Sequence, residues 1–340
     1  MDNLLLLGQD ALDSELLLSL LRKAGIVPPP VHLHLLKGGA NNRVLRIDLQ
    51  NSDSLVLKTY FHHAQDTRPR LRAEFEFLTY AWNQNLRNIP KPLAADPTKN
   101  GALYSYIDGS QPTHATPLFV QHATSFLTSL NKNKKEGTHL LPASEACTTL
   151  HHYTETVEKK LSRLLHSPQE TALEKKMHQF LHQELIPRWN HITNGLCKAT
   201  LHHLDPEPED LIISPSDFGL HNALLHSSGT PYFIDFEYAG WDDPAKTIAD
   251  FFLQPKIPIP FSHFQSFARA IAQLSLNGEK TLQRTIQVLP ICQIKWCCII
   301  LNVFTKTDKT RREFSQGIIS QTTQLEIAKN YLFSTPIDHR

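Results

Sequence analysis

The sequence predicts an α+β fold with two lobes: a small N-terminal lobe built on an antiparallel sheet with a helix, and a larger, mainly helical C-terminal lobe. Between residues 31 and 61, three short segments with strand-like alternation are separated by turn signals. The run DGSQP, residues 108–112, is the strongest linker signal in the chain. Helical spacing dominates beyond residue 117. We therefore expect lobes over residues 1–108 and 109–340.

Composition limits the classes of function. The chain has 340 residues and a net charge of +1, which gives no argument for binding nucleic acid or a membrane surface. Its five cysteines form no C-x-x-C pair, so we expect neither a disulfide framework nor a zinc site. We expect a reducing, cytoplasmic location. The N-terminal leucine run carries Asp2 rather than basic residues, so we expect no signal peptide. We also expect no membrane span, because no run of about eighteen apolar residues is evident.

The N-terminal lobe opens with a helix over residues 10–25, where leucines recur at helical spacing before Gly25 and three prolines end it. Three strands follow, VHLHLLKGG, NNRVLRIDL and SLVLKTYF, and form an antiparallel meander. A helix over LRAEFEFLTYAW comes next. Two more strands, near residues 92–94 and 102–107, complete the expected lobe.

Two features of this lobe suit a phosphate group. Gly38 and Gly39 lack Cβ atoms, so their turn could lie close over a phosphate, although a Gly-Gly turn between strands is more often only a turn. Lys58 lies in an apolar strand, where a buried ammonium needs an anionic partner. The helix offers Glu74 or Glu76, and the alternative is a lysine on an edge strand that points to solvent.

In the C-terminal lobe, residues 118–130 and 173–189 show helical spacing, and residues 291–304 are apolar all round, as in a buried helix. A short strand over 211–213 precedes a loop, and residues 223–226 and 231–234 flank the hairpin signal SSG. Residues 201–205, LHHLD, contain two histidines, but the acidic, proline-rich run after them favours a helix end and a loop over a metal cluster.

The hairpin region carries the strongest chemical signal. Asp217 and Asn222 are five residues apart, and Asp235 ends an apolar run thirteen residues later. Carboxylate and amide oxygens in this arrangement suit one or two Mg²⁺ ions and a hydroxyl nucleophile beside a nucleotide triphosphate. With the glycine turn, the strand lysine and the helix glutamate, they supply in chain order the groups that metal-assisted phosphoryl transfer needs.

In these motifs the sequence resembles the aminoglycoside phosphotransferase and choline/ethanolamine kinase superfamily, which has a bilobal protein-kinase-like fold. The motifs are GGANNRVLRI, LVLK, AEFEFL, SYIDG, SDFGLHNALL and FIDFEYAGWDDPAK, between about residues 36 and 250. The resemblance implies an enzyme that uses ATP and Mg²⁺ to phosphorylate a small-molecule alcohol.

The resemblance also implies a role for individual residues. Asp217 would be the catalytic base or would orient the acceptor hydroxyl, and Asn222 and Asp235 would bind Mg²⁺. Lys58 would bind the α- and β-phosphates with Glu74 as its partner. The remaining nucleotide contacts would come from the glycine turn and the hinge: Gly38, Gly39, Asn41, Asn42, Tyr104, Tyr106 and Ile107.

The sequence departs from the superfamily pattern at two positions. Pro215 stands where a histidine commonly precedes the base by two residues, and Thr247 stands where an aspartate follows the D-P pair. A proline-stiffened turn could replace the histidine as a support for the loop. We expect Asp250, one helical turn further on, to brace the catalytic loop in place of Thr247.

The acceptor is less well defined. Carboxylates and aromatic rings after the metal loop, at Glu237, Tyr238, Trp241 and Asp242, suit a cationic acceptor such as an amino alcohol or amino sugar. The alternative is that the run from Asp242 to Pro244 caps the following helix, which leaves a neutral sugar open.

Three functions follow from this reading. The leading hypothesis is an ATP- and Mg²⁺-dependent small-molecule kinase. A nucleotide-binding pseudokinase or regulatory module is the alternative, supported by Pro215 and Thr247. A protein Ser/Thr kinase ranks lower, because eight residues between Asp235 and Pro244 leave no room for an activation loop. The sequence specifies neither the acceptor, the oligomeric state nor the choice of ATP over GTP.

Overall fold

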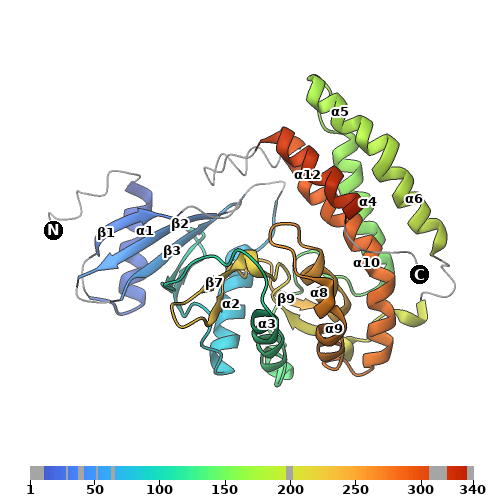
Figure 1. Ribbon diagram of the computed structural model, residues 1–340. Coiled ribbons are helices and arrows are strands. Elements are labelled where there is room, and N and C mark those ends of the chain that lie inside the picture. Colours follow the sequence, from blue (N-terminus) through green and yellow to red (C-terminus); the bar gives the residue numbers. More distant parts are fainter. Residues whose placement is uncertain are drawn as a thin grey trace. The chain divides into compact units, whose positions relative to one another are not determined.

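The computed structural model describes residues 11–27, 30–36, 42–50, 53–62, 66–196, 202–305 and 320–334. The chain divides into two compact units (Figure 1). The first unit contains the chain up to Gln111 and also Asn222–Tyr238, and the second contains Pro112–His221 and most of the chain from Ala239 onward. The α+β class and the bilobal, kinase-like fold expected from the sequence are confirmed.

The first unit is built on a five-stranded antiparallel sheet with strand order β1-β2-β3-β5-β4. The strands are β1 (Pro30–Leu35), β2 (Asn42–Leu49), β3 (Leu55–Tyr60), β4 (Pro92–Asp96) and β5 (Gly101–Ser105). The register places Lys58 opposite Val44 on β2 and Ala102 on β5, so this lysine lies on a central strand. The edge-strand alternative for Lys58 is therefore wrong.

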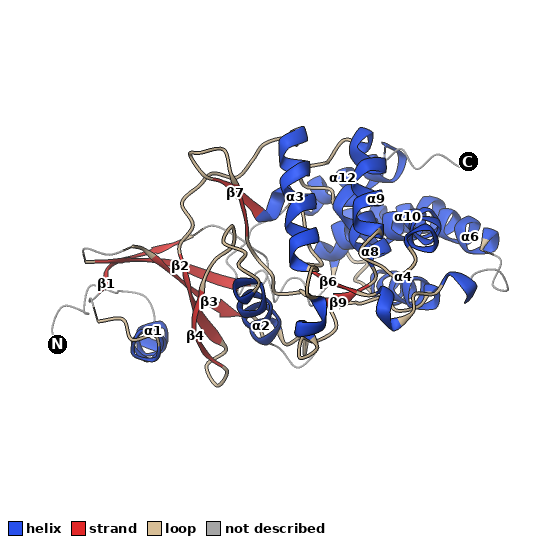
Figure 2. Cartoon of the chain, turned by 90° about the horizontal axis from the view of Figure 1, so that it is seen from below, coloured by secondary structure: helices blue, strands red, loops and turns tan. Residues whose placement is uncertain are grey.

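Two helices pack on this sheet, α1 (Ala11–Lys23) and α2 (Arg70–Asn83) (Figure 2). Successive side chains of a strand point to opposite faces. Leu55 and Leu57 of β3 therefore join the leucines of α1 in one apolar cluster, while Lys58 and Tyr60 face the α2 side. The alternation of β3 thus separates a largely apolar face from the face that carries charge.

A short hairpin belongs to the first unit although it lies more than a hundred residues further along the chain. It consists of β7 (Ala223–Leu225) and β8 (Pro231–Phe233), as the SSG turn signal indicated. Backbone hydrogen bonds join Ser110 to Leu225 and Phe233 to Asn88. The Phe236 ring stacks on Phe77 of α2 with ring centroids 4.7 Å apart. These contacts explain why the hairpin groups with the first unit, whereas the sequence assigned all of residues 109–340 to the C-terminal lobe.

The second unit is mainly helical (Figure 1). Its helices are α3 (Pro117–Leu130), α4 (Leu150–Leu165), α5 (Ala172–Phe180), α6 (Ile186–Gly195), α8 (Pro244–Leu253), α9 (Phe264–Ala272), α10 (Gly278–Ile300) and α12 (Gln321–Ser334). One π-helical turn, η3 (Leu181–Leu185), joins α5 to α6, so the single helix expected over 173–189 is interrupted. Short 3₁₀ turns are η2 (Lys134–Gly137), η4 (His202–Leu204), η5 (Pro208–Asp210), η6 (Leu220–Asn222), η7 (Phe261–His263) and η8 (Leu301–Phe304). The preference for a helix end and loop over a metal cluster at residues 201–205 agrees with η4, though residue 201 lies outside the described chain.

A two-stranded sheet in this unit supports the loop that carries Asp217. Strand β6 (Ile212–Ser214) pairs with β9 (Gly240–Asp242), a strand the sequence did not indicate. The segment at Leu141 bonds to Trp241 on the other side of β9. A Cβ at Gly240 would lie 2.2 Å from the Leu141 carbonyl oxygen, so only glycine fits this close approach.

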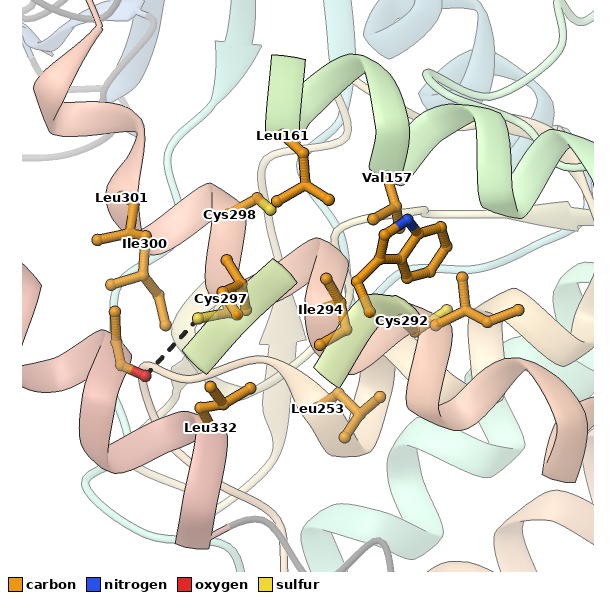
Figure 3. Close-up of a cluster of buried hydrophobic side chains, with 14 of the residues drawn as sticks. Val157, Leu161, Leu253, Cys292, Ile294, Cys297, Cys298, Ile300, Leu301 and Leu332 are labelled. Atoms are coloured by element: carbon orange, nitrogen blue, oxygen red, sulfur yellow. Dashed lines mark hydrogen bonds between the residues drawn. The ribbon is translucent and has the colours of Figure 1, made fainter. Parts of the chain in front are cut away.

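The core of the second unit surrounds α10, as Figure 3 shows. Side chains from α4, α8 and α12 meet Cys292, Ile294, Cys297 and Cys298 there, and the cysteines act as small apolar groups. Among the described residues, the segment Gly278–Phe304 is long and apolar enough to span a membrane by length and composition alone, a property that buried core helices share. However, 67% of its most apolar window is buried in this core, as the sequence predicted for residues 291–304.

Candidate active site

Lys58 lies at the centre of a cluster of charged side chains in the first unit. The Lys58 Nζ donates to Glu74 Oε2 at 2.6 Å and to Asp235 Oδ1 at 2.5 Å. Burial by itself would lower the pKa of Lys58, but the charges of Asp235, Glu74 and Glu237 outweigh it and raise the pKa. Lys58 is therefore a fixed cation on a buried strand. Glu74, and not Glu76, is its partner, because Glu76 instead pairs on the surface with Arg72.

Glu74 is held from several directions. Tyr60 donates its hydroxyl to Glu74 Oε2 at 2.8 Å, and the Phe236 amide donates to Oε1 at 3.3 Å. The Tyr104 hydroxyl lies 2.7 Å from that of Tyr60 and extends this network. These contacts fix the carboxylate of α2 and, through it, the position of the Lys58 ammonium.

Asn222 and Asp235 lie at the same open end of the β7–β8 hairpin. The Ile234 amide donates to the Asn222 carbonyl at 2.9 Å, which brings together the residues just before β7 and just after β8. Asp235 adopts a left-handed backbone conformation with φ of 66°, which is uncommon outside glycine. Its side chain is 28% exposed, whereas that of Glu74 is 4% exposed. Asp235 is therefore the carboxylate of the two that a metal ion can reach.

These donors suit magnesium. An amide and a carboxylate oxygen are hard ligands, and Mg²⁺ in phosphoryl-transfer sites takes one or two protein carboxylates together with phosphate oxygens and waters. Within the described chain, no group of three or more histidine, cysteine, aspartate or glutamate residues could hold a metal. An ion at Asn222 and Asp235 would accordingly depend on the nucleotide for its remaining ligands.

Asp217 lies in the second unit, in the loop after β6. Its Oδ1 is 2.9 Å from His221 Nε2, and its side chain is 32% exposed. The preceding residue, Ser216, has a left-handed φ of 65°, so the backbone turns sharply just before the carboxylate. Asp217 is thus presented on a constrained turn and remains partly open to solvent.

The loop that carries Asp217 is braced directly by Thr247. The Thr247 hydroxyl lies 2.8 Å from Ser214 Oγ, which accepts the Ser216 amide at 3.0 Å. Asp250 instead contacts Lys295 of α10 and accepts from Trp296 Nε1 at 2.8 Å. Asp250 is linked to the loop indirectly, through Lys246, whose Nζ lies 3.6 Å from Asp250 Oδ2 and donates to Ser216 Oγ at 3.4 Å. Position 247 keeps the bracing role because a hydroxyl pair can bridge to the loop without a charge.

The four residues considered for the acceptor are divided between the two units. In the first unit, Glu237 is buried and accepts from Asn42 Nδ2 at 2.7 Å, and Arg68 and Arg70 lie over the Tyr238 ring at 5.2 and 5.8 Å. Burial and the charge of Asp235 raise the pKa of Glu237. In this setting Glu237 and Tyr238 already have cationic or amide partners within the unit.

In the second unit, Asp242 is fully buried and accepts from Lys246 Nζ at 2.6 Å and from the Cys147 amide at 3.0 Å. Trp241 donates its indole N–H to the Gly137 carbonyl. Asp243 accepts from the Ala245 amide and is the N-cap of α8. The helix-capping alternative is therefore confirmed for this segment. The assignment of Asp242 to the acceptor is a misreading, because its oxygens serve the interior of the unit.

The predicted hinge follows β5. Tyr104 points its side chain into the buried tyrosine network, so only its backbone could contact a nucleotide. The amides of Ser105 and Tyr106 donate to Lys91 and Ser54, and Arg46 lies 4.4 Å from the centre of the Tyr106 ring. For Ile107 the structure gives no backbone hydrogen bond to another described residue. Gly38, Gly39 and Asn41 lie outside the described residues.

Sequence reasoning overlooked two residues of these clusters. Arg70 has a completely buried side chain and bonds Asp66 at 2.6 Å, with Glu237 3.6 Å from its Nε. His221 contacts Asp217. The i, i+4 spacing of His221 and Asp217 was a signal that could have been noticed. Nothing in the local sequence marks Arg70 as buried.

A buried strand lysine paired with a helix glutamate, together with the D-x4-N loop and the hairpin aspartate, is the set of groups that the sequence led us to expect for a kinase-like phosphotransferase. The chain belongs to the phosphotransferase enzyme family, whose model, APH, matches residues 32–274. No curated protein sequence matches the chain significantly.

Solved structures share the fold at low sequence identity. Choline kinase LicA from Streptococcus pneumoniae has a TM-score of 0.59 and 14% identity, over 95% of this chain and 100% of that one. Amicoumacin kinase hAmiN, solved with AMP-PNP and Ca²⁺, has a TM-score of 0.58 and 16% identity, over 96% and 95%. Spectinomycin phosphotransferase APH(9)-Ia, solved with ADP and spectinomycin, has a TM-score of 0.58 and 14% identity, over 94% of this chain and 98% of that one. At these identities the likeness shows the fold alone.

Proposed function

We propose that this protein transfers the terminal phosphoryl group of ATP to a hydroxyl group of a small molecule, with Mg²⁺ as cofactor. The observation that carries the proposal is the arrangement of Lys58 between Glu74 and Asp235. A buried lysine with a raised pKa is a permanent cation, and the two carboxylates set its position. Membership of the phosphotransferase family supports the same reaction.

Each residue of the proposed machinery has one task. Lys58 binds the α- and β-phosphates, and Asn222 and Asp235 hold the metal. Bound there, Mg²⁺ would neutralise charge that develops on the phosphate oxygens. Asp217 orients the acceptor hydroxyl and accepts its proton. The backbone between Ser105 and Ile107 contacts the adenine edge, for which the Ile107 amide is a suitable donor.

The acceptor belongs to the class of small hydroxylated metabolites: an amino alcohol, an amino sugar or a neutral sugar. The structure weakens the argument for a cationic acceptor, because Asp242 is buried and Glu237 already accepts from Asn42. The four described cysteines are free and buried, which supports our proposal of a reducing compartment such as the cytoplasm.

A coupled ADP-release screen over amino alcohols, aminoglycosides, sugars and amino sugars tests the proposal. Turnover with at least one acceptor is expected, and Asp217→Asn and Asp235→Asn should each reduce it by about a hundredfold or more. Glu76→Gln is the matched control, since Glu76 lies on the surface of the helix that carries Glu74. Full activity in Asp235→Asn would overturn the assignment.

Nucleotide binding without turnover would favour the regulatory module instead. In that case ATP would raise the melting temperature of the wild-type protein, but no acceptor would release ADP. Phosphate incorporation into protein in a lysate would favour the protein kinase alternative.

A further inference from the structure

The contact between His221 and Asp217 is unusual in its burial. His221 Nε2 lies 2.9 Å from Asp217 Oδ1, and the histidine side chain is only 3% exposed. An ionised carboxylate can only accept a hydrogen bond, so Nε2 must be the protonated ring nitrogen that donates. A buried donor one helical turn along the same loop therefore points at the carboxylate.

The imidazole ring is packed in a way that leaves it little freedom. A Cβ added to Gly219 would lie 3.1 Å from His221 Nδ1, 3.2 Å from its Cε1 and 3.3 Å from Gln254 Cγ. Because Gly219 has no side chain, the His221 ring has room to lie in this position. Such separations are tighter than ordinary van der Waals contact, so an added Cβ would require its neighbours to move by a few tenths of an ångström.

Gln254 forms a firm wall beside Gly219. Its Oε1 accepts the amides of Lys256 and Ile257, at 3.1 and 3.2 Å, and its Nε2 donates to the Ile257 carbonyl. With three contacts holding this side chain, an obstruction at Gly219 would be relieved by movement of His221 and not of Gln254.

We infer that His221 is a positioning residue that fixes the rotation of the Asp217 carboxylate. The inference rests on the proposed role of Asp217. Thr247 and Ser214 hold the backbone of the loop. The contact from His221 instead sets the direction of the Asp217 carboxylate oxygens. Pro215, two residues before Asp217, has no side-chain donor that could hold the carboxylate in this way.

Kinetics with four test variants and one control variant examine this role. The assay is ADP release, both with water as the phosphoryl acceptor and with any alcohol that the screen identifies. We expect His221→Leu to lower kcat by roughly ten- to a hundredfold with KM for ATP within about twofold, because a misplaced general base mainly affects the chemical step. His221→Gln can place an amide N–H near the former Nε2 and should recover most of kcat. In His221→Asn the side-chain amide reaches only as far as the former Nδ1, so this variant should not recover kcat.

Gly219→Ala should reproduce the kcat loss with His221 still present, and His166→Gln, an exposed histidine, should behave as wild type. Melting temperatures close to wild type in His221→Gln and His221→Asn would separate positioning from folding. Wild-type kcat in His221→Leu would overturn the inference, as would equal losses in the Gln and Asn variants.

A spectroscopic readout does not require the acceptor. In ¹⁵N-histidine-labelled protein, long-range ¹H–¹⁵N spectra should show His221 with its proton on Nε2, assigned by the signal lost in His221→Gln. Asp217→Asn should change the His221 signals. A proton on Nδ1 alone would overturn the inference. Failure of the proposed function would look different: Asp217→Asn would retain turnover whatever the state of His221.

Discussion

At the scale of single residues, the first unit concentrates charge in its interior. Glu74, Asp235 and Glu237 share Lys58 and Arg70, and four of these five side chains are less than a tenth exposed. Charges of this kind are expensive to bury and are stable only while every partner is present. The cluster should therefore respond sharply to the loss of one cation.

Lys58→Met tests that expectation. It leaves Glu74 and Asp235 without their shared cation, so we expect the free energy of unfolding to fall by about 3–5 kcal/mol. Urea denaturation followed by circular dichroism would measure it. The matched control is Arg72→Met, which breaks a surface pair and should cost about 1 kcal/mol or less. Equal losses in both variants would contradict the assignment of a buried cluster.

Glu145 should make stability depend on pH. Burial would raise its pKa, but Lys160, with further help from Lys295 and Lys246, lowers it to about 2. A lowered folded-state pKa stabilises the protein above the unfolded value near 4.5, and this contribution is lost as pH falls from about 4.5 towards 2. The stability difference between wild type and Glu145→Gln should shrink over that window, as equilibrium denaturation at several pH values would show. Glu158→Gln, at an exposed position of α4, is the matched control.

At the scale of elements, one carboxylate joins three helices. Asp243 caps α8, accepts from Arg284 of α10 at 2.7 and 2.8 Å, and accepts the Tyr153 hydroxyl of α4 at 2.8 Å. Arg284 and Asp243 are both fully buried. The packing of these helices around the core is thus fixed by an ionic contact as well as by apolar area.

Arg284→Met should therefore be severe. It leaves the Asp243 charge buried without its cation, and we expect a loss of about 3–5 kcal/mol in the free energy of unfolding. Tyr153→Phe removes one hydrogen bond and should cost about 0.5–1.5 kcal/mol. Combining Arg284→Met with Asp243→Asn should recover part of the loss, which a double-mutant cycle by urea denaturation would quantify. No recovery would mean that the arginine acts through its packing alone.

The elements also show what sequence reasoning can reach. The meander of β1, β2 and β3 and the β7–β8 hairpin were predictable because alternation and turn residues lie within a few positions of one another. Strand β9 was not, since its three residues form a strand only by pairing with β6 and bonding to the segment at Leu141. The interruption by η3 likewise has no marker in the apolar pattern.

The same distinction applies to the candidate site. Lys58, Asp217, Asn222 and Asp235 could be proposed as site residues because their chemistry and spacing are visible in the chain. Asp242 was misread because a carboxylate near a site and one buried against a lysine look identical in sequence. The bracing by Thr247 depends on a contact across thirty-three residues, which no local pattern carries.

At the scale of the whole molecule, nucleotide binding should stabilise the fold. A ligand that binds only the folded state at a hundred times its Kd adds about 2.7 kcal/mol. We expect AMP-PNP with Mg²⁺ to raise the melting temperature of the wild-type protein by several degrees, measured by differential scanning fluorimetry, and to raise it much less in Asp235→Asn. An undiminished shift in Asp235→Asn would show that this carboxylate takes no part in binding the metal–nucleotide complex.

The return of Asn222–Tyr238 to the first unit has a consequence for biosynthesis. When the sheet and α2 have left the ribosome, Lys58 still lacks Asp235, and Arg70 still lacks Glu237. At ordinary translation speeds the nascent chain waits roughly ten seconds for them. During that interval the charges of Lys58 and Arg70 lack part of their neutralising partners in an incompletely folded core. We therefore expect that the N-terminal lobe does not fold autonomously, and that a fragment that stops at the linker is captured by chaperones or degraded.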